Sequence, residues 1–127
     1  KDLDVADVIN KLSQLPKLRE LDISFCERTS IPKEIGSLTQ LRVLKVGANK
    51  LTNLPEQIGN LSQLNELVFS QFPESDFRAF SLEQKKEIIS MLPDCKILLV
   101  DYFGPVHGNY RLGKRSVQVT LSNVDSL

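Results

Sequence analysis

The sequence has 127 residues, of which 41% are hydrophobic, and its 16 basic and 16 acidic side chains give a formal net charge of zero. This length and composition predict one domain with its own apolar core. A neutral chain without a basic stripe is not expected to bind duplex nucleic acid, because such binding draws on clustered lysine and arginine. No run approaches the roughly 20 apolar residues that a membrane-spanning helix needs, so no membrane span is expected.

The first expected element is an amphipathic helix in residues 4–15. Five apolar residues recur at helical spacing and would share one face: Val5, Val8, Ile9, Leu12 and Leu15. Asp2 or Asp4 is available as its N-cap residue. We expect this helix to cover the first apolar layer of the next segment. It supplies no strand beside residues 19–23, which would remain an open sheet edge.

Two segments of 23 residues then repeat the same apolar spacing. They are "LRELDISFCERTSIPKEIGSLTQ" at 18–40 and "LRVLKVGANKLTNLPEQIGNLSQ" at 41–63. Each begins with LxxLxLxx followed by Cys26 or Asn49, and continues with (I/L)PxxIxxL. A fixed period of this size indicates a solenoid, in which one unit buries its apolar face only against stacked neighbours.

With this unit the chain resembles the leucine-rich repeat proteins, in particular those with short repeats and an "LP..IG.L" second half. The resemblance covers roughly residues 3–100. It implies an α/β solenoid with a short parallel sheet along its concave side, a capping helix at the N-terminus, and a helix plus β-hairpin as the C-terminal cap. The ending "KKEIISMLPDCKI" is similar to the last unit of many bacterial members.

The strands of this solenoid are expected to have one buried and one open face. In "LRVLKV", Leu44 and Val46 would point to the core, while Val43 and Lys45 would point outward, because side chains alternate along a strand. The outward positions are therefore free to carry a binding function.

The residue that follows each strand is expected to close the turn. A buried side-chain amide at Asn49 can satisfy backbone groups that the turn leaves unpaired. Phe72 falls at this position in the third unit, and we interpret Cys26 in the first as a small buried structural substitute rather than a reactive thiol. With two rungs between them, Cys26 and Cys95 would lie on the order of 14 Å apart, too far for a disulfide.

The repeat rhythm breaks after the third strand. "QFPESDFRAFSLEQKKEIISMLPDC" inserts five residues, and an amphipathic helix capped by Ser81 replaces the proline-type half-turn. Four apolar residues would face inward from this helix: Leu82, Ile88, Ile89 and Leu92. We expect Phe72, Phe77 and Phe80 to pack around it. Leu92, Cys95 and Ile97 then restate the strand pattern 28 residues after Leu64.

The C-terminal part predicts a β-hairpin. "KILLVDYF" (96–103) and "SVQVTLS" (116–122) read as strands, joined by a loop that contains Gly104-Pro105 and Gly108-Asn109. Such a hairpin would close the final sheet edge.

We assign the whole chain to a single domain. Its expected parts are a capping helix and partial repeat (1–17), the repeats (18–92), and the last strand with a C-terminal cap or tail (93–127).

No residue pattern predicts catalysis, a metal site or a cofactor. CxxC, HExxH, G-x-S-x-G and glycine-rich phosphate-loop motifs are absent. The single histidine, His107, lies between glycines in a loop and is expected to face solvent rather than act as a general base. Four carboxylates would gather on the sheet face and could bind a cation: Glu20, Asp22, Glu66 and Asp94. With Lys45 and Lys96 interspersed, we interpret them as a solvated patch.

The open strand face is the predicted binding surface. Phe25, Val43, Val68 and Leu98 would place apolar side chains there, ringed by charges, as in recognition surfaces with an apolar centre and a polar rim. The candidate partner-binding residues are Glu20, Asp22, Ser24, Phe25, Val43, Lys45, Glu66, Val68, Ser70, Gln71, Asp94, Lys96 and Leu98.

The predicted function is a non-catalytic protein–protein interaction module with an unidentified protein partner. One alternative is the substrate-recognition part of a larger enzyme, such as a ligase or kinase. Another is a structural element that self-associates through the open strand edge or the C-terminal tail. Extracellular animal members of the resembled family usually have disulfide-stapled end caps, which this sequence lacks. The resemblance therefore favours a cytoplasmic location, with a bacterial secreted or surface protein as the alternative.

Overall fold

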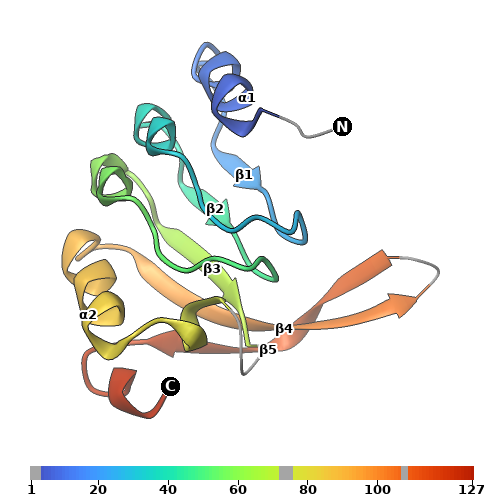
Figure 1. Ribbon diagram of the computed structural model, residues 1–127, viewed down its shortest axis with the longest axis vertical. Helices are drawn as coiled ribbons and strands as arrows, with labels where there is room; N and C mark the ends of the chain where they lie inside the picture. Colours follow the sequence, from blue (N-terminus) through green and yellow to red (C-terminus); the bar gives the residue numbers. More distant parts are fainter. Residues whose placement is uncertain (1–3, 72–75, 107–108) are drawn as a thin grey trace.

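The computed structural model describes residues 4–71, 76–106 and 109–127, and for 103–106 and 109–115 it describes the backbone. One five-stranded sheet has the order β1-β2-β3-β4-β5. Its strands are β1 (Glu20–Asp22), β2 (Val43–Lys45), β3 (Glu66–Ser70), β4 (Lys96–Val106) and β5 (Asn109–Val119). The first four are parallel and β5 is antiparallel to β4. Figure 1 shows the strands stacked along one side and the helical segments along the other, so the expected α/β solenoid is confirmed.

The strand register confirms the repeat of the sequence. Glu20 pairs with Val43, and Val43 pairs with Glu66, so equivalent residues of adjacent strands are one 23-residue unit apart. Leu44 and Leu67 are fully buried beneath the sheet, while Leu21 at the end of the stack is partly buried. The core is therefore a ladder of equivalent apolar residues, each packed on the next.

The second halves of the two complete units form short 3₁₀ helices, η1 (Lys33–Ser37) and η2 (Glu56–Asn60). Each begins directly after a proline in extended conformation, which pre-sets the backbone for a helical turn. Ile35 and Ile58 are fully buried and pack into the core opposite the sheet.

Helix α1 (Val5–Leu12) caps the N-terminal end. Asp4 is its N-cap residue and accepts a hydrogen bond from the Asp7 backbone N–H at 3.2 Å, as one of the two expected alternatives requires. Ile9 is only 1% exposed and joins the core. The expectation for Leu15 was wrong: it is 52% exposed, because the helix has already ended at Leu12 and the following turn directs it to solvent.

Helix α2 (Leu82–Met91) begins with a complete capping box. The Gln84 backbone N–H donates to the Ser81 hydroxyl at 3.1 Å, and the Ser81 N–H donates to the Gln84 side chain at 2.8 Å. Ile88 is buried as expected, but Leu82, the first residue of the helix, is 42% exposed, so its expected inward orientation was wrong.

The aliphatic stem of Lys85 takes part of the buried helix face instead. Lys85 is buried, and its ammonium group donates to the Leu127 carbonyl and lies 5.9 Å from the centre of the Phe77 ring. Burial lowers the pKa of Lys85, and the charge of Arg78 lowers it further. Phe77 lies beside Lys85 of α2 as expected, and Phe77 and Phe80 also pack on Phe69 of β3. Phe72 lies outside the described residues.

The C-terminal strands pair in a different register from the expected one. Lys96 pairs with Glu66, and Ile97 with Leu67. The offset is therefore 30 residues instead of 28, because Cys95 lies in the turn before β4. A shift of two residues leaves the facing of the strand unchanged, so Ile97 and Leu99 still point into the core.

The hairpin is longer than the sequence predicts. Strand β4 continues to Val106 and β5 begins at Asn109, so most of the expected loop pairs as strand, and β5 ends at Val119. The register is irregular between Val100 and Tyr102 and between Phe103 and Val106, and the second irregularity contains the Gly104-Pro105 dipeptide. In Figure 1 this ribbon extends to the right, beyond the repeats.

Candidate functional site

The open face of the sheet carries side chains in rows that cross the strands. The first row consists of Glu20, Val43, Glu66 and Lys96, and the second of Asp22, Lys45, Val68 and Leu98. Gln118 of β5 lies opposite Leu98, and because paired residues point to the same face, it extends the second row. Sequence reasoning missed Gln118, since the pairing of β5 could not be read from the repeat.

An ion pair joins the two rows near β1. The Lys45 ammonium group lies 3.1 Å from a Glu20 carboxylate oxygen. Burial by itself would lower the pKa of Lys45, but the hydrogen bond and charge of Glu20, with the charge of Asp22, raise it above its ordinary value. Lys45 therefore stays positively charged at neutral pH and compensates part of the acidic end of the face.

A third row, formed by Ser24, Gly47, Ser70 and Val100, is covered rather than open. Ser70 is fully buried, and Val100 is 6% exposed. The rings of Phe25 and Tyr102 meet edge to face, with centroids 4.9 Å apart. The expectation that Ser70 is available to a partner was wrong, because side chains of the same molecule occupy this end of the sheet.

Glycine is required under this aromatic pair. A Cβ atom at Gly47 would lie 2.7 Å from the Ser70 backbone nitrogen and 3.3 Å from a ring carbon of Tyr102. Burial raises the pKa of the Tyr102 phenol, so the ring stays neutral beyond its usual range. Val68 in the second row is also only 3% exposed, between Lys45 and Leu98, so its expected exposure was wrong as well.

The Ser70 hydroxyl points to a buried carboxylate. It donates to Asp76, which also accepts from the backbone N–H groups of Ala48 at 2.6 Å and Asn49 at 3.0 Å. Asp76 is fully buried and has a φ of 55°, in the left-handed region that Asp tolerates better than most residues. This network holds the end of the covered row in place.

Asn49 performs the expected role in the preceding turn. Its side-chain oxygen accepts from the backbone N–H groups of Cys26 and Arg28, both at 3.0 Å, and its amide nitrogen donates to the carbonyl of Ile23 at 2.9 Å. The interpretation of Cys26 as buried was wrong, since it is exposed. Asn49 reaches back from the next unit to close the Cys26 turn, so the thiol is not needed there.

The remaining candidates lie around the margin. Phe25, Ser24 and Gln71 are partly buried. Asp94 is exposed but precedes β4, so it lies beside the first row rather than within it. His107 lies outside the described residues.

The open patch is the part of the face that remains accessible. Its residues are Glu20, Asp22, Val43, Lys45, Glu66, Lys96, Leu98 and Gln118. Across the described ranges, no group of three or more His, Cys, Asp or Glu side chains could hold a metal ion. No helix in the described part of the chain is long and apolar enough to cross a membrane.

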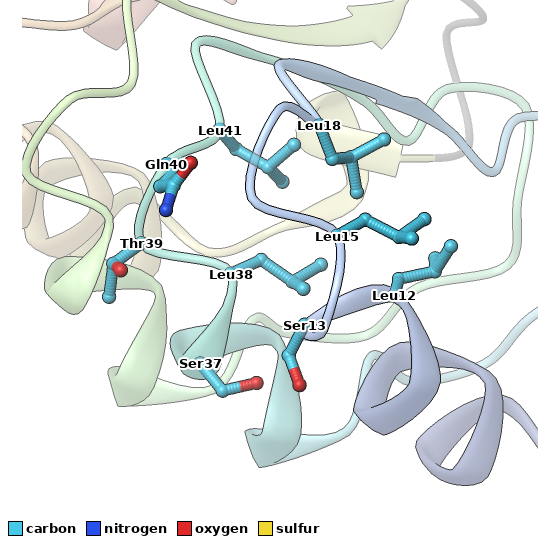
Figure 2. A pocket seen from close by; sticks show the side chains of 9 residues that line it. All are labelled: Leu12, Ser13, Leu15, Leu18, Ser37, Leu38, Thr39, Gln40 and Leu41. Carbon is cyan, nitrogen blue, oxygen red and sulfur yellow. The ribbon is translucent and has the colours of Figure 1, made fainter.

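A small pocket lies at the other side of the molecule, between the end of α1 and η1. Figure 2 shows its leucine side chains grouped together and extending in a similar direction, with Ser13 and Ser37 at one end. Its volume of about 50 Å³ has room for water but not for an organic ligand. The pocket therefore offers no alternative to the open patch.

Comparison with known proteins agrees with the repeat geometry. A family model described as Leucine Rich Repeat matches residues 17–38. A solved leucine-rich repeat protein of Leptospira interrogans is 32% identical over 76% of this chain, with a TM-score of 0.52. The chain is a leucine-rich repeat protein.

This leucine-rich repeat chain spans 28% of the length of the Leptospira chain. No curated protein matches it. Leucine-rich repeats are in general protein-interaction modules.

Proposed function

We propose that this chain is a non-catalytic module that binds a protein partner through the open patch on the concave side of its sheet. The observation that carries the proposal is a pair of partly exposed apolar side chains, Val43 and Leu98, on a sheet face whose other accessible positions are charged or polar. Partner-binding surfaces combine an apolar centre with a polar rim in this way.

The covered third row narrows the surface that a partner can use. Because Phe25 and Tyr102 close that end of the sheet, a partner would contact the first two rows, which precede the covered row along each strand. Four short strands and the start of the hairpin offer about 600–1,000 Å² to one partner, so moderate affinity is expected.

The first prediction tests the patch directly. The immobilised chain should retain a protein from the lysate or secreted fraction of its source, and the double variant Val43→Asp, Leu98→Asp should weaken that retention by about tenfold or more, because buried unpaired charge in an interface centre is costly. Quantitative pull-down followed by titration of the retained protein measures the loss. Val68 is left unchanged because it is buried.

A matched control carries the same added charge elsewhere. Gln14 and Gln63 are exposed and lie outside the open patch, so Gln14→Asp, Gln63→Asp should retain the partner as the unmodified chain does. Circular dichroism and thermal unfolding verify that both variants fold. Equal retention by the patch variant and the control would contradict the proposal.

A further inference from the structure

A groove of about 680 Å³ lies between α1 and the first unit, at the N-terminal end of the solenoid. Six apolar residues line it: Val5, Val8, Ile9, Leu12, Leu21 and Ile23. The rest of its lining consists of Cys26, Glu27, Arg28, Thr29 and Lys50. The volume is large enough for two or three aliphatic side chains.

The groove runs beside the free edge of the sheet. Strand β1 ends the strand order, and α1 contributes no strand next to it. The backbone groups of Arg19 and Ile23 are directed to β2, since Val43 N–H donates to Arg19 at 3.0 Å and Ile23 N–H donates to Lys45 at 2.9 Å. By alternation, the N–H and C=O groups of Glu20 and Asp22 point to the open side.

The negative charge of β1 favours some chains over others as binding partners at its edge. Glu20 and Asp22 project from β1 onto the open sheet face, where Lys45 of the neighbouring strand β2 compensates part of their charge. A second copy pairing β1 with β1 would set acidic residues opposite acidic residues, which is unfavourable for cross-strand pairs. An added strand with basic side chains on that face would instead place positive charge beside Glu20 and Asp22, as Lys45 of β2 does on the other side.

We propose that the edge of β1 and the groove beneath α1 form a docking site for an extended segment of another protein, with basic side chains facing Glu20 and Asp22 and alternate apolar side chains entering the groove. Main-chain hydrogen bonds to β1 would supply affinity, and the groove and the two carboxylates would supply selectivity. This site shares Glu20 and Asp22 with the open patch, but it uses the β1 edge and the groove and does not require Val43 or Leu98.

The test uses three synthetic peptides with blocked ends, of sequence KVKLKVK, EVELEVE and KVKPKVK. The basic peptide should bind the chain, measured by fluorescence anisotropy of a labelled copy, and the acidic peptide should bind about tenfold more weakly or less. The proline peptide should also bind weakly, since its central residue has no N–H to donate. In the variant Glu20→Lys, Asp22→Asn, the order of the basic and acidic peptides should reverse. Asparagine at residue 22 retains the acceptor that Asp22 offers to the Ser24 N–H at 2.9 Å.

Cys26 reports whether the peptide occupies the groove. Its exposed thiol lines the site, so alkylation by iodoacetamide should slow several-fold at saturating KVKLKVK. Cys95 is a reference in the same molecule, because it is distant from the groove lining and burial raises the pKa of its thiol to about 11. Leu98→Asp alone should leave peptide binding within about twofold, which separates this site from the open patch.

Three results would overturn the inference. Equal binding of all three peptides would show that neither charge nor main-chain pairing selects the ligand. Unchanged alkylation of Cys26 at saturating peptide would place binding elsewhere. Concentration-dependent association in light scattering that Glu20→Lys, Asp22→Asn abolishes would show that a second copy occupies the edge.

Discussion

Asp76 accepts hydrogen bonds from the backbone of the preceding turn, a role that Asn49 has one unit earlier. In the complete unit, Asn49 accepts from the backbone N–H groups of Cys26 and Arg28. Asp76 does the same for Ala48 and Asn49, but it lies 27 residues after Asn49 instead of 23. Asn49 is equivalent to Cys26, so the two residues share one donor position, but Asp76 accepts from Ala48 where Asn49 accepts from Arg28. A carboxylate suits this position because every group that faces it is a donor.

The second prediction concerns this residue. Asp76→Ala should lower the free energy of unfolding by about 3–5 kcal/mol, since the backbone N–H groups of Ala48, Asn49 and Ser70 and the Ser70 hydroxyl lose their acceptor. Asp76→Asn should cost about half as much, because asparagine keeps one acceptor oxygen and tolerates a positive φ. Urea unfolding of both variants gives the two values. A cost below about 1 kcal/mol for the alanine variant would show that water replaces the carboxylate.

At the scale of elements, the helical segments differ more than the strands do. The strands β1, β2 and β3 repeat in register, whereas the helical segments vary: α1 precedes β1, the 3₁₀ helices η1 and η2 follow β1 and β2, and the 3₁₀ helix η3 (Asp76–Ala79) and α2 follow β3. Pro32 and Pro55 directly precede η1 and η2. Ser81 stands at this position before α2, and its capping box starts a longer helix. Gln84 also donates to the Thr52 carbonyl at 3.1 Å, which ties α2 to the preceding unit.

The third prediction tests the start of α2. Ser81→Ala should lower the free energy of unfolding by about 1 kcal/mol, because the Gln84 N–H loses its capping acceptor. Ser81→Asp retains a capping oxygen next to the positive end of the helix and should have no measurable cost. Thermal and urea unfolding compare the three proteins. Equal stability of the alanine and aspartate variants would mean that the cap contributes nothing.

At the scale of the whole molecule, two different elements close the ends of the core. Helix α1 covers the first unit and inserts Ile9, while the hairpin and η4 (Val124–Ser126) cover the last and insert Val119 and Val124. Within the described residues, only the C-terminal cap continues the sheet, because β5 pairs along β4. Helix α1 buries apolar surface without pairing, so no described residue covers the β1 edge as a strand.

The fourth prediction tests whether the N-terminal cap unfolds with the core. Ile9→Ala should lower the free energy of unfolding by about 2–4 kcal/mol within a single transition, because Ile9 is buried in the common core. Leu15→Ala, at an exposed neighbouring site, should change it by less than about 0.5 kcal/mol. Circular dichroism and intrinsic tyrosine fluorescence should report the same midpoint. A separate early transition confined to the helical signal would contradict this expectation.

The sequence by itself determined the solenoid, the inward and outward faces of the strands, the Asn49 turn and the Ser81 cap of α2, and it narrowed the cap of α1 to Asp2 or Asp4. These features depend on spacing and on residues close in the chain, and the unit repeats nearly unchanged. Which residues form the buried face of α2 was only partly predictable, because Lys85 is buried there and contacts Phe77 and Leu127.

Tertiary structure alone decided which outward residues remain accessible. Val68 and Ser70 follow the repeat pattern of an open strand face, yet both are buried, and Tyr102 meets Phe25 across the third row. Tyr102 reaches that row because β4 continues past β3, and β4 is extended by its pairing with β5. Contacts between segments so far apart leave no periodic signal in the sequence, so a repeat pattern can show where side chains point but not what covers them.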